Sequence, residues 1–464
     1  MGLGRLGDRA IGTARVPMAA ALVAMALPVA ACTGTGDGGD PVAAPLDSDL
    51  AAAVDAAVTD AATAAGEPLL TPDPEVYAAL ADALAAAGDP RAGWVVVDLG
   101  QFVFRPEPAA GLITAASDLA EDEFAVRTWW KGLGDHLISA DVAAPPGLLD
   151  WKRKLYGAAD TTFLRFLDDD ADVDWRHVSF GGVLPDDRPF GSPETCWCIP
   201  ALDDPPAAPA AEVDWYPDHR LVFGIEVGGE HRAYPLHIME AHELVNDTIG
   251  GRPISLTYCT LCRSAVAVLL DELPPGVERP VLRTSGLLQR SNKLVFDRVT
   301  YSLIDQFTGE ALSGPLREAG VTLPRVTVVT SRWDEWRAAH PGTTLMAGKD
   351  GAGADYPLDP LGERDAAGPI FPVGGFPDDL RAIQRVVGVV PDPDGGGEPT
   401  IAFSVDDLAV AIEAGETVTH RGVTVVPDGS GYRLVDADGG ELVSSEASWF
   451  AWIQRFGDTD LWPS

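Results

Sequence analysis

The stretch "PISLTYCTLCRSAVAVLL", residues 253–270, consists of two short apolar segments joined by a turn-like tetrapeptide that carries Cys259 and Cys262. Both segments have the length and composition of strands, so the stretch predicts one strand on either side of the cysteine pair. Two cysteines at this spacing close a small disulfide ring, exchange with a substrate disulfide, or bind one metal ion through two sulfurs. The residues alone leave these three interpretations open.

From about residue 174 onward, the sequence consists of similar short runs rich in β-branched residues, separated by glycine and proline. Residues 221–236, "LVFGIEVGGEHRAYPL", predict a hairpin with its turn at Gly228 and Gly229. Further hairpins are predicted at residues 293–312, 417–426 and 432–443. Short helices are predicted at residues 331–342 and 446–456, and the second of these, rich in aromatic residues, is expected to dock on a sheet.

The preceding part of the chain has helical spacing instead. Apolar residues recur at helical intervals in residues 74–100, 122–137 and 148–170. The large side chains of this region are expected to form a packed core: Trp129, Trp130, Trp151, Leu155, Tyr156, Phe163 and Phe166.

These patterns predict an α+β fold, with a helical N-terminal domain followed by a β-rich, mostly antiparallel domain with short helices. Strands and helices do not alternate regularly, which argues against a parallel doubly wound sheet. The expected organisation is a lipoprotein signal peptide at residues 1–31 and a flexible tether at 32–48. A helical domain at 49–173 and a β-rich CxxC domain at 174–464 follow.

The first 32 residues carry an export signal. Three arginines precede an apolar run at residues 16–31, which is too short for a comfortable membrane span and is typical of a signal-peptide core. The run ends in Val-Ala-Ala-Cys, which resembles a bacterial lipobox with Cys32 as the lipid-attachment site. We therefore expect a lipid-anchored protein on the extracytoplasmic face of the cell membrane, with the membrane as a partner.

Charge and cysteine content restrict the function classes. The 464-residue chain has a formal net charge of −37, which excludes a nucleic-acid-binding surface built on clustered lysine and arginine. Outside the membrane the redox environment is oxidising, so the cysteines beyond Cys32 are expected to be paired, metal-bound or catalytic.

Residues 237–251, "HIMEAHELVNDTIGG", precede the cysteine pair and include His242 in an expected helix. A histidine near two thiols assists proton transfer, lowers a thiol pKa or binds a metal. Its alternative role is to cap or fill the helix. Arg263 follows Cys262 directly, and a neighbouring cation favours a thiolate.

Cys196 and Cys198 flank a tryptophan. Cysteines separated by one residue rarely bond to each other, so this pair is expected to bind a metal or to have partners elsewhere. Together with Cys259 and Cys262 it would supply four sulfurs, enough for a tetrahedral zinc site.

A long series of segments resembles one family, the domain of unknown function 3179. The matching segments include "WKRKLYG", "FGGV", "GIEVGGEHRAYPLHIMEAHELVNDTIGG", "LTYCTLCRSAVAV", "TSGLLQRSNKLVFDR", "WDEWRAAHPGTT" and "WFAWIQRF", spread over about residues 125–464. The resemblance places Cys259 and Cys262 on the family's cysteine pair, and His242, Glu243, Asn246 and Asp247 on its His-Glu…Asn-Asp motif. Thr260 stands where the family usually has proline, and the Cys196–Cys198 pair is not a family feature.

Members of this family are commonly exported, and some are selenoproteins with selenocysteine in the cysteine motif. The resemblance therefore implies a redox role for the pair, without a substrate and without a required cofactor. The leading hypothesis is thiol redox chemistry: Cys259 attacks an oxidised protein partner or a peroxide-type substrate and Cys262 resolves the product. His242 would assist proton transfer and Arg263 would stabilise the thiolate. Glu243, Asn246 and Asp247 would support the site.

Two alternatives remain at this point. In the first, copper or zinc is bound by Cys259, Cys262 and His242, with Cys196 or Cys198 as further candidates, because soft sulfur ligands suit these metals. In the second, the protein is an envelope scaffold or binding module and the cysteine pair is a structural disulfide. Whether the protein is an enzyme is left open.

Overall fold

The segments on either side of the cysteine pair form an antiparallel hairpin in the computed structural model. β7 (Arg252–Cys259) pairs with β8 (Ser264–Leu269), and Cys259 lies opposite Ser264. The predicted strands are thereby confirmed. β6 (Leu244–Ile249) pairs with β7 through Gly250 and Gly251, both at positive φ, and a side chain at Gly250 would lie 2.2 Å from the carbonyl oxygen of Val227. This turn therefore requires glycine.

The structure describes residues 44–66, 72–102, 106–347, 355–362, 364, 368–390 and 400–463. The expected signal peptide, the lipid-attachment residue Cys32 and most of the expected tether lie outside the described residues. The described residues belong to one compact unit. The domain boundaries expected at residues 31, 48 and 173 stay predictions.

The expected α+β fold class is wrong. Within the described residues the strands form five separate sheets of four or five strands each, which makes this region a five-bladed β-propeller rather than a single β-rich α+β domain. The first sheet orders β1 (Val178–Phe180), β9 (Leu282–Gln289), β10 (Asn292–Asp297) and β11 (Leu303–Asp305). The second orders β12 (Arg325–Val326), β8, β7, β6 and β2 (Leu202–Asp203).

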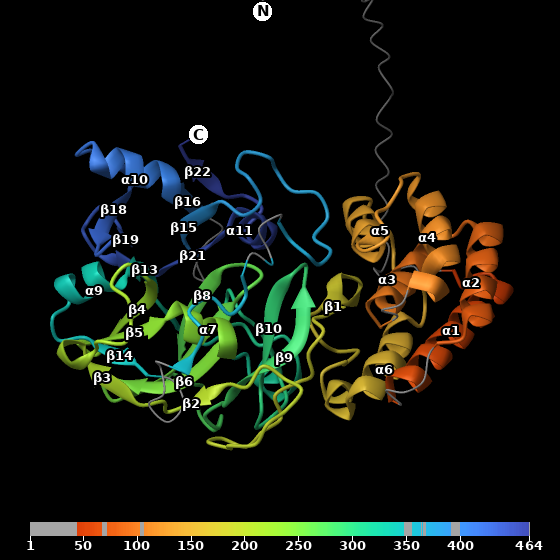
Figure 1. Cartoon of the computed structure of the whole chain (residues 1–464), viewed down its shortest axis with the longest axis horizontal. Coiled ribbons are helices and arrows are strands. Elements are labelled where there is room, and N and C mark those ends of the chain that lie inside the picture. Colours follow the sequence, from red (N-terminus) through yellow and green to blue (C-terminus); the bar gives the residue numbers. More distant parts are fainter. Residues whose placement is uncertain are drawn as a thin grey trace, which may run out of the picture. The chain divides into compact units, whose positions relative to one another are not determined.

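Figure 1 labels strands of the other three sheets, of which the third combines early and late strands. The third orders β13 (Val329–Arg332), β4 (Leu221–Val227), β5 (Glu230–Pro235), β14 (Thr344–Met346) and β3 (Ala207–Pro209). The fourth orders β21 (Ser444–Ser448), β15 (Arg385–Val389), β16 (Ile401–Ser404) and β22 (Asp460–Trp462). The fifth orders β17 (Thr419–His420), β18 (Val423–Asp428), β19 (Gly431–Val435) and β20 (Glu441–Leu442).

The reason for the error is the origin of the strand partners. The β4–β5, β10–β11, β17–β18 and β19–β20 hairpins are close in sequence and were predicted, with the β4–β5 turn at Gly228 and Gly229, whereas the β9–β10 and β18–β19 hairpins were not. Other pairs join distant segments: β1 pairs with β9, and β3 with β14. Such long-range pairing is decided by packing, so the periodicity of a single segment carries no signal for the number of sheets.

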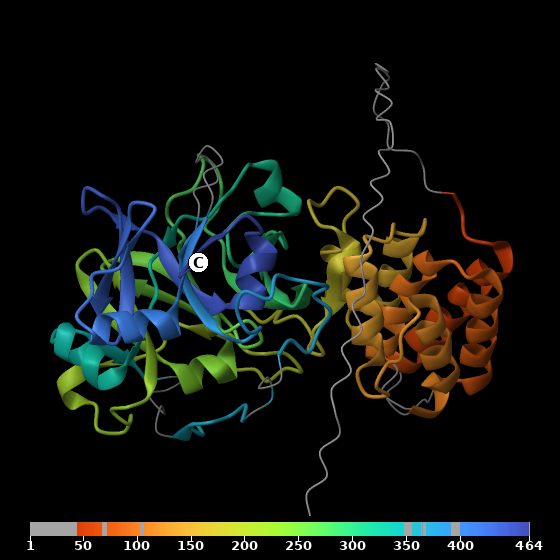
Figure 2. The same cartoon turned by 90° about the horizontal axis from the view of Figure 1, so that it is seen from above.

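The helices are grouped by position in the chain. The helices that come first in the chain lie together in both views (Figures 1 and 2). They are α1 (Ser48–Gly66), α2 (Pro74–Ala87), α3 (Gly93–Phe102), α4 (Pro106–Ala120), α5 (Trp129–Ser139) and α6 (Leu148–Ala159). Between and after the strands lie α7 (Leu236–His242), α8 (Gly314–Glu318), α9 (Trp333–Ala339), α10 (Val405–Glu413) and α11 (Trp449–Arg455). The 3-10 helices are η1 (Pro90–Ala92), η2 (Thr161–Arg165), η3 (Trp175–His177) and η4 (Ala210–Glu212).

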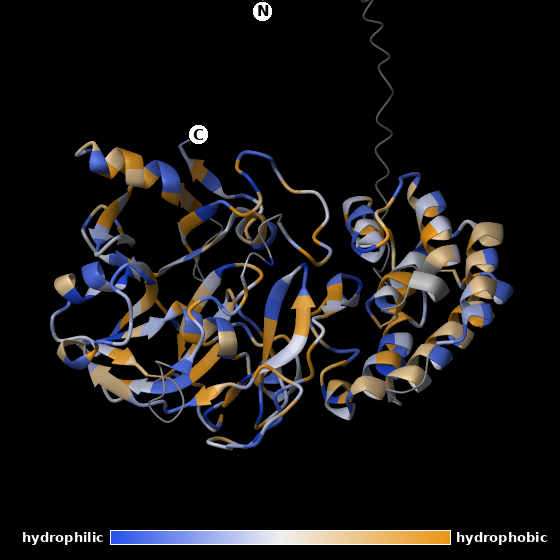
Figure 3. Cartoon of the chain, viewed as in Figure 1, coloured by the Kyte–Doolittle hydropathy of each residue, from blue (hydrophilic) through white to orange (hydrophobic). Residues whose placement is uncertain are grey.

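Local sequence accounts for the helix boundaries. The Asp73 side chain accepts a hydrogen bond from the Glu75 N–H at the start of α2, and Gly88 ends the helix in the left-handed conformation. In α10, Val405 and Leu408 are buried and Asp406 is exposed, and Figure 3 shows both hydrophobic and hydrophilic residues along this helix.

The helices α1–α6 share a hydrophobic core with the first sheet. The seven large side chains expected to pack are all part of this core or rest against it, which confirms that prediction. Phe180 of β1 and Phe296 of β10 belong to the same cluster. Lys152 of α6 reaches across it, donating to Asp98 of α3 and to the carbonyl oxygen of Val178, each at 2.8 Å.

The third and fourth sheets repeat one construction. In the third sheet, β13 pairs antiparallel with β4, β4 antiparallel with β5, and β5 parallel with β14, the strand after α9. In the fourth sheet, β21 pairs antiparallel with β15, β15 antiparallel with β16, and β16 parallel with β22, the strand after α11. α9 and α11 each place a buried tryptophan, Trp336 or Trp452, against a strand glycine, Gly224 or Gly388. In each copy the indole N–H donates to a threonine hydroxyl at 3.0 Å. In the chain, the cysteine hairpin lies between β5 and β13 of the first copy.

Candidate functional site

The turn between β7 and β8 brings the two thiols of the CTLC motif together. Cys259 ends β7, and Arg263 adopts φ +52° just before β8 begins, so the chain reverses within four residues. The Cys262 N–H donates to Cys259 Sγ at 3.3 Å. Both cysteines are free thiols and both are buried, with 1% of Cys259 and none of Cys262 exposed.

The two sulfurs have different neighbours. Cys262 Sγ lies 3.1 Å from the carbonyl oxygen of Ser291 and 3.1 Å from Oδ1 of Asn292, while Cys259 Sγ lies 3.9 Å from the Ser291 oxygen. Both cysteines belong to the core cluster that contains α11. Because both close neighbours of Cys262 are acceptors, this sulfur makes its hydrogen bonds only as a protonated thiol.

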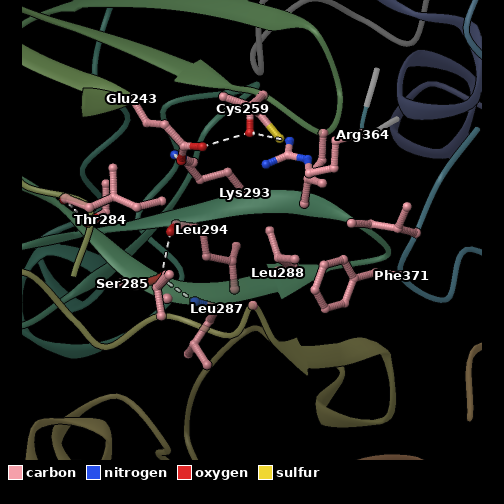
Figure 4. Close-up of a pocket in the computed structure, with 17 residues that line it drawn as sticks. Glu243, Cys259, Thr284, Ser285, Leu287, Leu288, Lys293, Leu294, Arg364 and Phe371 are labelled. Atoms are coloured by element: carbon pink, nitrogen blue, oxygen red, sulfur yellow. Dashed lines mark hydrogen bonds and ion pairs between the residues drawn. The ribbon is translucent and has the colours of Figure 1, made fainter. Parts of the chain in front are cut away.

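A cavity of about 270 Å³ opens beside Cys259 but not beside Cys262. Figure 4 shows its polar end, formed by Cys259, Glu243, Lys293 and Arg364. Apolar side chains line most of the remainder: Val183, Ile199, Leu261, Leu287, Leu288, Leu294, Ile370 and Phe371. The cavity therefore fits an apolar group of limited size whose reactive atom reaches Cys259.

The polar end is a chain of contacts. Lys293, at the start of β10, forms a buried ion pair with Glu243. Thr260 donates to Glu243 Oε1 at 2.7 Å and accepts from Arg364 at 2.9 Å. Glu243 reaches this position because α7 ends at His242 and Glu243 adopts φ +57°. The cation and the carboxylate beside Cys259 are thus held in place by each other.

These surroundings separate the pKa values of the two thiols. Burial raises the pKa of Cys259, but hydrogen bonding from Cys262 and the Lys293 ammonium outweigh it, so the pKa lies below the ordinary value. Burial also raises the pKa of Cys262, and the hydrogen bond to Cys259 and its charge raise it further. Of the two thiols, Cys259 is therefore the one that ionises first.

The structure places His242 away from this cavity. Its Nδ1 is 2.6 Å from the carbonyl oxygen of Pro200, and its Nε2 is 2.8 Å from the hydroxyl of Tyr356. His242 lines a second cavity, of about 590 Å³, together with Cys196. The left-handed conformation of Glu243 sends these two neighbouring side chains in different directions, so Glu243 and not His242 lines the Cys259 cavity.

Asn246 and Asp247 lie on β6 and hold other strands. Asn246 donates to Asp203 Oδ1 at 2.9 Å and to the Leu282 carbonyl oxygen at 3.2 Å. Asp247 accepts from Arg232 at 2.7 Å and from the Tyr234 hydroxyl at 2.8 Å. Both residues are buried and neither lines the cavity, so their contacts are those of structural residues.

Sequence reasoning missed the residues that do surround the thiolate. Lys293 occupies the position expected for Arg263, which is partly buried but does not line the cavity. The available signal was composition: only five of the 33 basic residues are lysines, and Lys293 stands at the head of an apolar strand. Thr260 and Arg364 gave no such signal.

Cys196 and Cys198 form a disulfide with each other, with their Cα atoms 5.1 Å apart, so the expectation that they would not pair is wrong. The turn around Trp197 brings the two Cα atoms within disulfide range. Among the described residues, the only His, Cys, Asp or Glu group with three ligand atoms within 4.8 Å of one another is this pair with Asp186. The described structure therefore does not bring Cys259, Cys262 and His242, or all four sulfurs, together as a metal site.

The Asp186 group is itself a poor metal site. Arg188 donates to both carboxylate oxygens of Asp186, at 2.6 and 2.8 Å, and the Ala201 N–H donates to one of them at 2.8 Å. Sulfurs in a disulfide lack the thiolate charge that makes cysteine a metal ligand.

Within the described residues, no helix is both long and apolar enough to cross a membrane.

Neither the curated proteins nor the solved structures contain a match to this chain. A family model described as "Protein of unknown function (DUF3179)" matches residues 197–439, which is more than half of the chain and includes the cysteine hairpin. This match confirms the resemblance found in the sequence. The chain therefore belongs to the DUF3179 family.

Proposed function

We propose that this protein carries out thiol-disulfide exchange through Cys259 and Cys262. The observation that carries the proposal is the difference between the two cysteines. Cys259 lines the cavity and has a lowered pKa, whereas Cys262 does not line the cavity and has a raised pKa. A nucleophile that faces a cavity and a resolving thiol next to it are the two parts that exchange requires.

The proposed reaction has two balanced steps. The Cys259 thiolate attacks one sulfur of a substrate disulfide, forms a mixed disulfide and releases the other substrate sulfur as a thiolate. Cys262 then loses its proton and attacks Cys259 Sγ, which forms the Cys259–Cys262 disulfide and releases the second substrate thiolate. Two electrons pass from the pair to the substrate, and the released thiolates take up protons according to their pKa values.

The first step prepares the second. The negative charge of Cys259 is one of the causes that raise the pKa of Cys262. This charge disappears when Cys259 enters the mixed disulfide, so the pKa of Cys262 falls at the moment when Cys262 must attack. Lys293 and Glu243 are positioning residues in this scheme, because they set the charge around Cys259 without reacting.

A trapping experiment tests the proposal. We expect Cys262→Ser to accumulate a mixed disulfide on Cys259 when the protein is treated with a small aromatic disulfide such as 5,5′-dithiobis(2-nitrobenzoate), because no resolving thiol remains. Wild-type protein treated in the same way should release two thiolates per molecule and end as an internal disulfide. Intact-mass spectrometry and the released chromophore measure both results.

The matched control is Cys259→Ser, in which the remaining thiol is buried and protonated and should not react in the folded protein. Equal reactivity of the two single variants, or an internal disulfide that no reductant reaches in the folded state, would contradict the proposal. The second result would favour the scaffold alternative with a structural disulfide.

We also propose that lipid on Cys32 anchors the protein to the outer face of the cell membrane. The support is the apolar run at residues 16–31 followed by the lipobox-like Val-Ala-Ala-Cys. Metabolic labelling with a tritiated fatty acid should label the wild-type protein and not Cys32→Ser. Absence of label in the wild-type protein would contradict the anchor and leave the exchange reaction unaffected.

A further inference from the structure

The Cys196–Cys198 disulfide is the opposite of the buried pair in exposure. Cys196 is exposed, and the indole of Trp197 between the two cysteines is 89% exposed, the largest value among the exposed large apolar residues of the described structure. Cys198 is half-buried and forms an isolated parallel β-bridge with Leu184. A disulfide in this position is accessible to a protein as well as to a small reagent.

The loop that carries this disulfide is held without it. Arg188 donates to the carbonyl oxygens of Ser192, at 3.4 Å, and Glu194, at 3.2 Å. At the other end, the Leu184 N–H donates to the Trp197 carbonyl oxygen at 3.1 Å. A disulfide that spans a single residue removes little entropy from the unfolded chain, because this contribution grows with the length of the closed loop. The bond is therefore of little use as a staple.

We propose that the Cys196–Cys198 disulfide is a second redox site, facing solvent, that accepts two electrons from the exposed dithiol of a partner protein. Trp197 would be the contact residue for that partner, since an exposed tryptophan beside the reacting bond supplies a large apolar surface. The Cys196–Cys198 disulfide is separate from the Cys259–Cys262 pair, so this inference does not depend on the function proposed for that pair.

The greater exposure of Cys196 than of Cys198 sets the direction of attack. A partner thiolate attacks Cys196 Sγ, which forms an intermolecular disulfide and releases Cys198 as a thiolate. The released Cys198 thiolate then takes up a proton from water. The second thiol of the partner then loses its proton and attacks the partner's sulfur in the mixed disulfide, which breaks the bond to Cys196 and releases Cys196 as a thiolate that takes up a proton from water. The partner ends oxidised, and Cys196 and Cys198 end reduced, with two electrons and two protons gained.

Reduction of the full-length protein by two reagents tests this site. The reagents are reduced thioredoxin, as a protein dithiol, and tris(2-carboxyethyl)phosphine, as a small reductant. Alkylation and peptide mass spectrometry report the redox state of residues 196–198. We expect both reagents to reduce the bond in the folded protein. Trp197→Ala should slow reduction by thioredoxin about tenfold and leave reduction by the phosphine unchanged.

Two control variants separate reduction at this site from effects of the buried pair and of folding. The Cys259→Ser, Cys262→Ser double variant should keep the same reduction rates at residues 196–198, and this result is independent of whether the buried pair performs exchange. The Cys196→Ser, Cys198→Ser double variant should unfold close to the wild-type temperature. Failure of thioredoxin to reduce the folded protein, equal slowing of both reagents by Trp197→Ala, or a large loss of stability in Cys196→Ser, Cys198→Ser would overturn the proposal.

Discussion

Replacing Lys293 by methionine is expected to slow alkylation of Cys259 by iodoacetamide at pH 7 by about ten- to a thousand-fold. Lys293 is the cation that helps to lower the pKa of Cys259, and Glu243, its ion-pair partner, acts in the opposite direction. The variant removes the favourable charge and leaves the carboxylate close to the sulfur. The loss of the cation raises the pKa of Cys259 and reduces the fraction of thiolate, because the Glu243 carboxylate then acts on the sulfur without an opposing charge.

Glu243→Gln is the matched opposite, because it removes only the unfavourable charge and should speed alkylation. Lys293→Arg keeps the charge and should stay close to the wild type, which separates electrostatics from damage to the fold. Rates are measured on the Cys259 peptide by mass spectrometry. Coincident pH–rate curves for Lys293→Met and the wild type would contradict the assignment of Lys293.

The pH dependence of stability follows from the same shifts. The pKa of Cys259 is lowered, so its contribution to stability is present above the pKa of an unfolded cysteine and is lost as pH falls through the lower folded value. The pKa of Cys262 is raised, so its contribution is present below the unfolded pKa and is lost as pH rises through the higher folded value. The folded protein is therefore most stable when Cys259 is a thiolate and Cys262 is a thiol.

Lys152→Met is expected to lower the free energy of unfolding by about 3–5 kcal/mol. The Lys152–Asp98 pair is almost completely buried, at 2.8 Å, and joins α6 to α3. Lys152 also donates to the Val178 carbonyl oxygen, which ties the helices to β1. Removing the ammonium leaves a buried carboxyl whose pKa burial already raises in spite of Lys152.

A double variant distinguishes the loss of the ion pair from the loss of packing. Lys152→Met combined with Asp98→Asn should recover most of the stability, because no uncompensated charge remains buried. Chemical denaturation followed by circular dichroism measures all three proteins. Equal destabilisation in the single and the double variant would show that Lys152 contributes through packing.

The local structure of this protein was largely predictable. The turn at Gly228 and Gly229 lies where the glycine pair placed it, since both residues have positive φ and complete a two-residue hairpin connection. The helix at α9 and the aromatic helix at α11 also lie where helical spacing placed them. In these segments the information is contained in neighbouring residues.

The assembly of these segments was not predictable in the same way. The repeated construction around Trp336 and Trp452 keeps few identical residues, and its identity lies in strand pairing and in the contacts with Gly224 and Gly388. Four of the five sheets combine strands that are far apart in the sequence, whereas the fifth is built from the consecutive strands β17–β20. Their partners are chosen by complementary packing, which a single sequence does not display.

For the site, the sequence by itself determined that two thiols lie together on a turn between two strands, because the spacing of Cys259 and Cys262 and their apolar flanks are local features. Only the tertiary structure decided which thiol faces a cavity and which residues set its charge. Lys293 is distant from Cys259 in the chain but pairs with Glu243 beside it, while His242, next to Glu243, turns to Pro200. A pKa depends on charges and burial in space, so it is decided by contacts between distant segments and not by the order of residues.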